Sequence, residues 1–284
     1  MIEIAQTHKH LIADVLSTET QTGQGAFWWL GQHTFIVKVS GKIIYIDPWF
    51  APWEARQTPT LLDYSEGQHA DIVLVTHGHG DHLCPETLKQ MVSASPNAIF
   101  VCPRTEAHRL REEAGVPDNR IRPIDAGGVI EIEGAKITAI KSKHETFDEH
   151  LEHGFPYLGY VVEIGGVTFY HAGDTIMYDG LLTTLQQWKH FDAMFLPING
   201  RDAVRFKANC MGNFTFQEAA ELAGELKPSV AVPAHYDMFI GNQEDPAKFV
   251  DFLEAKYPGV KSWVGAAGER ILFPLTRYLN PAFA

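Results

Sequence analysis

Short apolar runs alternate with glycine, proline and polar turns along the chain. The runs are four to eight residues long and rich in β-branched and aromatic residues, which is typical of strands. In the first half they cover residues 26–30, 34–39, 43–46, 71–76 and 98–102. In the second half they cover residues 129–132, 135–140, 157–164, 167–171, 193–198, 229–234 and 270–273. Glycine-containing turns at 40–42, 133–134 and 165–166 predict β-hairpins.

Segments with helical character lie between these runs, at 85–92, 105–114, 215–226 and 246–256. Pro85 suits a first helical turn, and residues 215–218 form a capping-box sequence. Residues 1–22 predict an amphipathic helical extension ahead of the core. Strands and hairpins dominate each half, with helices after them. We therefore predict an α/β (α+β) fold, one domain over residues 1–284, built as a four-layer αβ/βα sandwich of two mixed β-sheets flanked by helices.

The composition limits which binding partners and which cellular compartment we expect. The chain has 284 residues and a formal net charge of -12, so its surface as a whole repels phosphate backbones and we expect no nucleic-acid partner. A small anionic substrate is not excluded, because a local cationic pocket can oppose the overall charge. The 3 cysteines are far apart and odd in number, which favours a reducing cytoplasm over a disulfide framework. We find no signal-peptide pattern and no membrane-length apolar run, and expect no membrane partner.

The candidate chemistry is concentrated directly after the apolar run at 71–76. Residues 77–82 read His-Gly-His-Gly-Asp-His. His77 and His79 lie two apart, so an extended loop can aim both at one metal, and Asp81 with His82 can be turned toward a second. Glycine lets the backbone turn tightly and adds no side chain that would block the ligands. A cluster of this density after a buried strand predicts a metal site at the mouth of a strand-to-helix connection.

The His-x-His-x-Asp-His pattern resembles the signature of the metallo-β-lactamase-like hydrolases. The resemblance implies the metallo-β-lactamase type of sandwich and further ligands at other strand ends. We assign these to His144, Asp174 and His235, and keep His150 and His153 as alternatives to His144.

The implied ligand sets are His77, His79 and His144 for the first metal and Asp81, His82 and His235 for the second, with Asp174 bridging both. Asp47 would orient a ligand imidazole by accepting its other N–H, and His171 would support the site rather than ligate. Two cations lower the pKa of a bridging water enough to supply hydroxide near neutral pH. The hydroxide would attack a carbonyl, and the catalytic Asp81 would take or relay the proton.

Residues 27–31, 170–174 and 232–237 are similar to the L-ascorbate-6-phosphate lactonase group. This closer resemblance implies a metal-dependent hydrolase of the carboxylic ester class, a cytoplasmic homo-oligomer that opens a sugar lactone such as L-ascorbate 6-phosphate with manganese. The nitrogen and oxygen donors alone suit two divalent ions, Mn²⁺ or Zn²⁺, and also admit Fe²⁺.

Residues that choose the substrate are expected in loops around the metals. The candidates are Trp53 in the long connection 51–68, Asn199, Arg201 and Asn213 around a locally basic loop, and Tyr236 beside the last ligand. The alternatives are a phosphodiesterase or another ester or amide hydrolase of the same fold. An oxidoreductase of the diiron type is disfavoured, because that group usually has Glu where this chain has His79. A non-catalytic binding module is disfavoured by the full ligand set.

Overall fold

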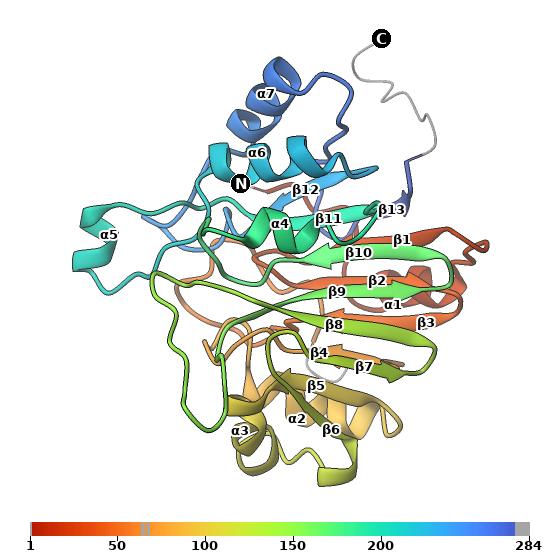
Figure 1. The fold of residues 1–284 in the computed structure, drawn as a ribbon. Helices are drawn as coiled ribbons and strands as arrows, with labels where there is room; N and C mark the ends of the chain where they lie inside the picture. The colour runs from red at the N-terminus through yellow and green to blue at the C-terminus, as the bar shows by residue number, and fades with distance from the viewer. Residues whose placement is uncertain (1, 64–65, 67–68, 276–284) are drawn as a thin grey trace.

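Two mixed β-sheets pack face to face in the computed structural model, which describes residues 2–63, 66 and 69–275 (Figure 1). The first sheet has the order β13-β1-β2-β3-β4-β5-β6. Its strands are β1 (Gly25–Trp29), β2 (Phe35–Val39), β3 (Lys42–Ile46), β4 (Ile72–Leu74), β5 (Ile99–Pro103), β6 (Ile121–Ile124) and β13 (Arg270–Phe273). The strands from β3 to β6 run parallel, and β13, β1, β2 and β3 pair antiparallel.

The second sheet has the order β12-β11-β10-β9-β8-β7. Its strands are β7 (Val129–Ile132), β8 (Ala135–Lys141), β9 (Leu158–Ile164), β10 (Val167–His171), β11 (Ala193–Pro197) and β12 (Ala231–Ala234). The pairs β10–β11 and β11–β12 are parallel, and the hairpins from β7 to β10 are antiparallel.

Helices lie outside the two sheets (Figure 1). They are α1 (His8–Ser17), α2 (Pro85–Ala94), α3 (Ala107–Glu112), α4 (Leu181–Leu185), α5 (Ala203–Lys207), α6 (Phe216–Leu226) and α7 (Pro246–Lys256). The helix α3 contacts β6, while α6 contacts β11 and α7. This arrangement confirms the predicted four-layer sandwich. None of the helices in the described part of the chain is long and apolar enough to cross a bilayer.

Several predicted elements need correction. The N-terminal helix spans only His8–Ser17, because Ile4 instead pairs with Ala267 as an isolated β-bridge. The strand β6 was missed because Pro123 interrupts its apolar pattern, and β6 lies at a sheet edge where a missing N–H is tolerated. The helices α4 and α5 were missed because five residues are too few to show a helical period. Pro85 at the start of α2 and the Thr215–Glu218 capping box of α6 are confirmed.

Contacts between the sheets fix the end of the sandwich where β4 stops. The rings of Phe35 and Phe195 lie 4.3 Å apart between the two inner faces. The Tyr160 hydroxyl donates to the carbonyl of Val75 at 2.8 Å, and the N–H of Leu158 donates to the carbonyl of Thr76 at 3.0 Å. The segment that leads out of β4 is therefore held by both sheets before its ligand-rich loop begins.

Candidate metal centre

The loop at 77–82 turns back on itself immediately after β4. The N–H groups of His82 and Leu83 both donate to the carbonyl of His79, at 3.0 and 2.7 Å. Gly78 packs against the turn Arg104–Glu106, where an added Cβ would collide with the Glu106 carboxylate. Glycine at this position therefore lets the loop lie close to the turn before α3 while its histidines point inward.

The structure gathers the predicted donors into two groups. In each group, one ligand atom per residue lies within 4.8 Å of the others. The first group is His77, His79, His144 and Asp174. The second group is Asp81, His82 and His235. These donors come from four strand ends, at β4, β8, β10 and β12, which meet at one edge of the sandwich.

Asp174 lies between the two groups. Its Oδ2 is 3.6 Å from Nε2 of His144 and 3.1 Å from Nε2 of His235, and its Oδ1 is 3.4 Å from Nε2 of His82. The preceding Gly173 has a φ of 59°, and an added Cβ there would collide with the carbonyl of Leu158. Glycine is required for this turn, which aims the carboxylate at both groups.

Asp47 fixes the orientation of His82. Its carboxylate accepts hydrogen bonds from the Thr76 N–H at 2.7 Å, the Thr76 hydroxyl at 2.6 Å and Nδ1 of His82 at 2.7 Å. The His82 Nε2 then faces the centre, where it is buried with no hydrogen-bond partner among the described residues. Asp47 and His235 have positive φ angles of 45° and 59°. Such left-handed backbone in non-glycine residues is often found at functional sites.

His144 is oriented in the same way from the other sheet. Its Nδ1 lies 2.9 Å from the carbonyl of Gly212, which leaves Nε2 facing Asp174. His150 and His153, the alternatives to His144, stack on each other with ring centres 4.8 Å apart in an exposed loop and join neither group. His171 lies outside both groups, with its Nε2 3.1 Å from the carbonyl of His33.

The electrostatics of the groups favour positive charge at their centre. Burial opposes ionisation of Asp174, yet His235 and His82 hold its pKa well below the usual value. Burial also opposes protonation of His82, but Asp174, Asp81 and Asp47 raise its pKa well above normal. Burial lowers the pKa of His144 to about 4, which leaves a neutral imidazole. In the absence of a cation, protons on the histidines of the second group balance the carboxylates.

These features fit a divalent cation in each group. The side-chain atoms His82 Nε2 and Asp174 Oδ1 are buried and lack hydrogen-bond partners among the described residues, although they lie 3.4 Å apart. Leaving buried polar atoms unpaired costs free energy that a coordinated ion would offset. A cation would displace the protons from His82 and His235 and leave neutral imidazoles and ionised carboxylates, the forms that bind metals.

Sequence reasoning missed two residues in the turn between β1 and β2. The Gln32 side chain donates to Asp81 Oδ2 at 2.7 Å, and its Nε2 lies 3.0 Å from Nε2 of His235. His33 is buried with its Nδ1 3.5 Å from Asp174 Oδ1, and burial lowers its pKa to about 4 despite that carboxylate. The available signal was the position of both residues at a strand end on the same edge as the ligand loop.

Tyr157, just before β9, was also missed. Its ring centre lies 5.3, 5.8 and 5.2 Å from those of His77, His79 and His144. Burial is the main cause that raises its pKa, so the phenol keeps its proton at neutral pH. Tyr157 therefore places a hydroxyl-bearing ring against the first group.

The predicted substrate contacts lie in different surroundings. Trp53 is 53% exposed, and its ring lies 3.9 Å from the position that a Cβ on Gly80 would occupy. Arg201 makes two hydrogen bonds to the Glu218 carboxylate, at 2.6 and 2.8 Å, so its guanidinium is already paired. The buried Asn213 donates to the side-chain oxygen of Asn199 at 3.1 Å.

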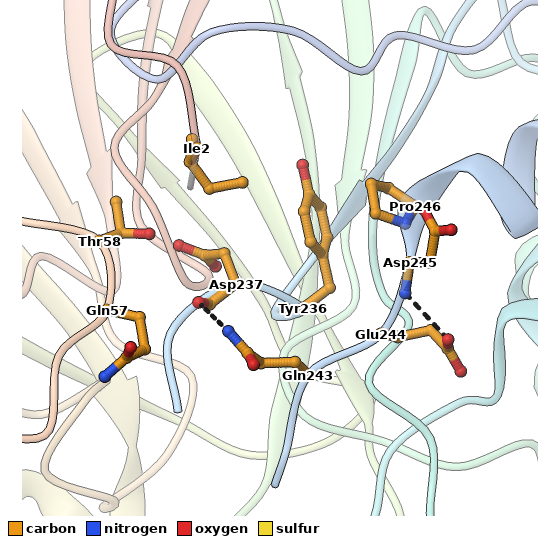
Figure 2. A pocket seen from close by; sticks show the side chains of 9 residues that line it. All are labelled: Ile2, Gln57, Thr58, Tyr236, Asp237, Gln243, Glu244, Asp245 and Pro246. Atoms are coloured by element: carbon orange, nitrogen blue, oxygen red, sulfur yellow. Dashed lines mark hydrogen bonds between the residues drawn. The ribbon is translucent and has the colours of Figure 1, made fainter. Parts of the chain in front are cut away.

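Tyr236 stacks on Trp29, with the ring centres 5.3 Å apart. Tyr236 lines a cavity of about 410 Å³ together with Asp237, Thr58 and Gln243, and none of the seven donors lines it. Figure 2 shows these side chains. Asp237 accepts a hydrogen bond from the Gln32 N–H at 2.9 Å. Gln32 thus links Asp237 of the cavity to Asp81 of the second group.

Comparisons with known proteins agree with this geometry. Residues 42–236 match the family model of the beta-lactamase superfamily domain. A UPF0173 metal-dependent hydrolase of Sulfurisphaera tokodaii is 30% identical over 246 residues, which is 86% of this chain and 97% of the relative. Another from Caldivirga maquilingensis is 31% identical over 257 residues, which is 88% of this chain and 99% of the relative.

A solved structure, that of the metallo hydrolase Igni18 from Ignicoccus hospitalis, superposes with a TM-score of 0.70 at 24% identity, covering 88% of this chain and 98% of Igni18. At this identity it shows the fold alone. Together the matches and the two packed sheets define a metal-dependent hydrolase of the metallo-β-lactamase fold. Within that class the chain belongs to the UPF0173 metal-dependent hydrolase family. The names of these relatives give a reaction class and no substrate.

Proposed function

We propose that the chain hydrolyses a small lactone, such as a sugar lactone related to L-ascorbate 6-phosphate, with two divalent metal ions. The observation that carries the proposal is the position of Asp174, within 3.6 Å of ligand nitrogens from both donor groups. A carboxylate with two oxygens suits cations about 3.5–4 Å apart, the usual spacing of two-metal sites. The lactone itself is supported by the resemblance of the motifs around residues 27–31, 170–174 and 232–237.

His77, His79 and His144 would hold the first ion, and Asp81, His82 and His235 the second. Divalent cations at such sites lower the pKa of bound water and polarise carbonyl oxygens. All the donors are nitrogen or oxygen atoms, which suits Mn²⁺, Zn²⁺ or Fe²⁺. Among the donors only His79 and Asp81 keep partial exposure, so the substrate approaches from their side.

Asp81 is suited to accept the proton of the attacking water. Burial opposes its ionisation, but His82 and His235 hold its pKa below the usual value, so it is a carboxylate at neutral pH. The Gln32 amide donates at 2.7 Å to its Oδ2, the oxygen that faces His82 and His235, so Oδ2 would hold the ion and Oδ1 is left for the proton. A positioned carboxylate of this kind contributes about 10²–10⁴-fold to a hydrolytic rate.

Tyr157 is suited to stabilise the leaving alkoxide of a lactone. It keeps its proton because burial raises its pKa, and its ring stands against three histidines of the first group. Donation of a phenolic hydrogen bond to the ring oxygen would ease its departure. Trp53, which borders Gly80 beside the exposed side of the loop, would cover one face of the substrate.

The Arg201 guanidinium is not free to bind the phosphate of a phosphorylated lactone. The bidentate pair with Glu218 occupies it, and the pair holds the pKa of Arg201 above its usual value. A phosphate would have to separate this pair. The substrate test therefore needs each lactone with and without a phosphate group.

The experiment is a hydrolysis panel with the protein loaded in turn with Mn²⁺ or Zn²⁺. The panel holds phosphorylated and unphosphorylated sugar lactones, a simple aryl ester and bis-p-nitrophenyl phosphate. We expect lactone opening that Asp81→Asn lowers at least about 10²-fold, while Asp251→Asn on the exposed face of α7 leaves it unchanged. Turnover of the phosphodiester with none of the lactones would replace the lactonase by a phosphodiesterase.

A further inference from the structure

A second cavity lies away from the metal centre, on the outside of the second sheet. It has a volume of about 540 Å³ and lies between β8 and the segment of α4 and Trp188. Lys136, Thr138 and Ile140 are every second residue of β8, so their side chains lie on the same face of the sheet. In Figure 1 the second sheet lies in front of the first, and α4 lies on the viewer's side near β10 and β11.

The walls of this cavity are mainly apolar and aromatic. Phe155, Tyr178 and Trp188 line it, together with Ile140 of β8. Small-molecule sites are typically cavities of about 300–1,000 Å³ with apolar walls and a few convergent polar groups. The volume and the walls meet this description.

Lys141 is an unpaired cation at the cavity. Its Nζ lies 5.9 and 5.6 Å from the ring centres of Phe155 and Tyr178, and 4.8 Å from that of Phe147. Over the described residues, no carboxylate lies within 4.0 Å of it. Lys136, the other lysine of the lining, is bound to Glu163 at 2.9 Å.

Thr138 supplies the second polar group. Its side chain is 8% exposed, and its Oγ1 is buried without a hydrogen-bond partner among the described residues. A buried hydroxyl without a partner is costly, and a ligand in the cavity would satisfy it. The lining contains no acidic residue, although the chain carries a net charge of -12.

We propose that this cavity is a binding site for an amphipathic monocarboxylate. The carboxylate pairs with the Lys141 ammonium and accepts a hydrogen bond from the Thr138 hydroxyl, while an apolar tail lies against the three aromatic rings. A free cation next to an aromatic wall selects an anion with an apolar body over an alcohol or an amine of the same length. The site is independent of the proposed lactonase reaction.

The cavity is also connected to the loop that carries His144. Lys141 precedes His144 by three residues, and Phe147 and Phe155 lie on the loop that follows it. The Tyr178 hydroxyl donates to the carbonyl of Lys141 at 2.5 Å, which fixes the end of β8. A bound carboxylate therefore slows opening of the backbone around residues 138–141 and 155.

The test is isothermal titration calorimetry of the metal-loaded protein with sodium octanoate, 1-octanol and octylammonium. We expect octanoate to bind, with neither neutral nor cationic analogue binding as tightly. Lys141→Gln should weaken octanoate about tenfold or more, and Thr138→Val about threefold or more, since each removes one polar partner. Lys143→Gln is the matched control, because Lys143 faces Phe147 but does not line the cavity.

Hydrogen exchange then locates the bound octanoate. Slower exchange at 138–141 and 155, with unchanged metal content in both variants, supports the proposal. Three calorimetric results overturn it: no octanoate heat with the wild type, unchanged octanoate affinity in Lys141→Gln, or equal affinity of the wild type for octylammonium. Exchange that slows only at the metal loop would also overturn it, since the carboxylate would then be a ligand of the metal centre.

Discussion

Replacement of Asp47 by asparagine isolates the contacts that hold His82 in place. Asp47 Oδ1 accepts from the Thr76 N–H, and Oδ2 accepts from both the Thr76 hydroxyl and Nδ1 of His82. Asparagine keeps the size of the side chain but puts an NH₂ group in place of one oxygen. In one orientation the new NH₂ group faces the Thr76 N–H, and in the other it faces Nδ1 of His82. Either way, two donors face each other.

The size of the effect follows from the loss of the group that orients His82. Removing such a partner lowers metal affinity about 10–100-fold, which is about 1.4–2.8 kcal/mol. The metal-free protein also loses a buried hydrogen bond to a charged group, and we expect its free energy of unfolding to fall by about 1.5–3 kcal/mol. The two effects are measured separately, by competition for Zn²⁺ with a chromophoric chelator and by urea unfolding after removal of metal.

Asp71→Asn is the matched control. Asp71 stands just before β4, at the opposite end from Thr76, and accepts from the Ile43 N–H at 2.9 Å and from Lys42 at 3.1 Å. This change should lower stability slightly and leave Zn²⁺ affinity at the wild-type value. Wild-type Zn²⁺ affinity in folded Asp47→Asn would show that Asp47 does not orient His82 for the metal, as would an equal loss of affinity in Asp71→Asn.

Three other predictions address the same site. Burial lowers the pKa of His33 and of His144 from 6.5 to about 4, so between these pH values the unfolded chain binds more protons than the folded one. The free energy of unfolding of the metal-free protein should therefore fall as the pH drops, by about 3 kcal/mol per histidine. Urea midpoints that stay flat from pH 6.5 to 4 would contradict this. His144→Ala should weaken binding of one of the two ions at least about tenfold, whereas His153→Ala in the exposed loop should not, as chelator titration can show; equal effects would reopen the assignment. Tyr157→Phe should lower kcat for lactone opening about 10–100-fold with KM and metal content unchanged, and an unaffected kcat would remove the phenol from the mechanism.

The ligand loop was predictable because its donors are contiguous and follow a strand. Asp174 and His235 could be added because the resemblance to the metallo-β-lactamase-like hydrolases implies further ligands at strand ends, and each of the two follows a buried apolar run. Gln32 and His33 were not identified, because their contacts with Asp81 and Asp174 depend on how the β1–β2 turn meets the other strand ends. The way these strand ends come together depends on the tertiary fold and leaves no local pattern in the sequence.

The region around the substrate could be predicted only as a set of loops. Arg201 stands in a locally basic stretch, but its pairing with Glu218 depends on the first turn of α6 lying beside the loop. Tyr236 follows His235 directly, yet the positive φ of His235 turns the chain so that Tyr236 stacks on Trp29. Single residues next to a ligand therefore cannot be assigned to the substrate side from their position in the sequence.

The number of divalent ions bound per chain decides whether Asp174 joins two metal sites. Elemental analysis is done on gently purified wild type and on Asp174→Asn, and the folded fraction of each is measured. The substitution removes the negative charge between the two donor groups. We expect two ions per wild-type chain, and fewer than one per folded chain of Asp174→Asn together with loss of hydrolysis. A single ion in the active wild type, or two ions retained in folded Asp174→Asn, would contradict it.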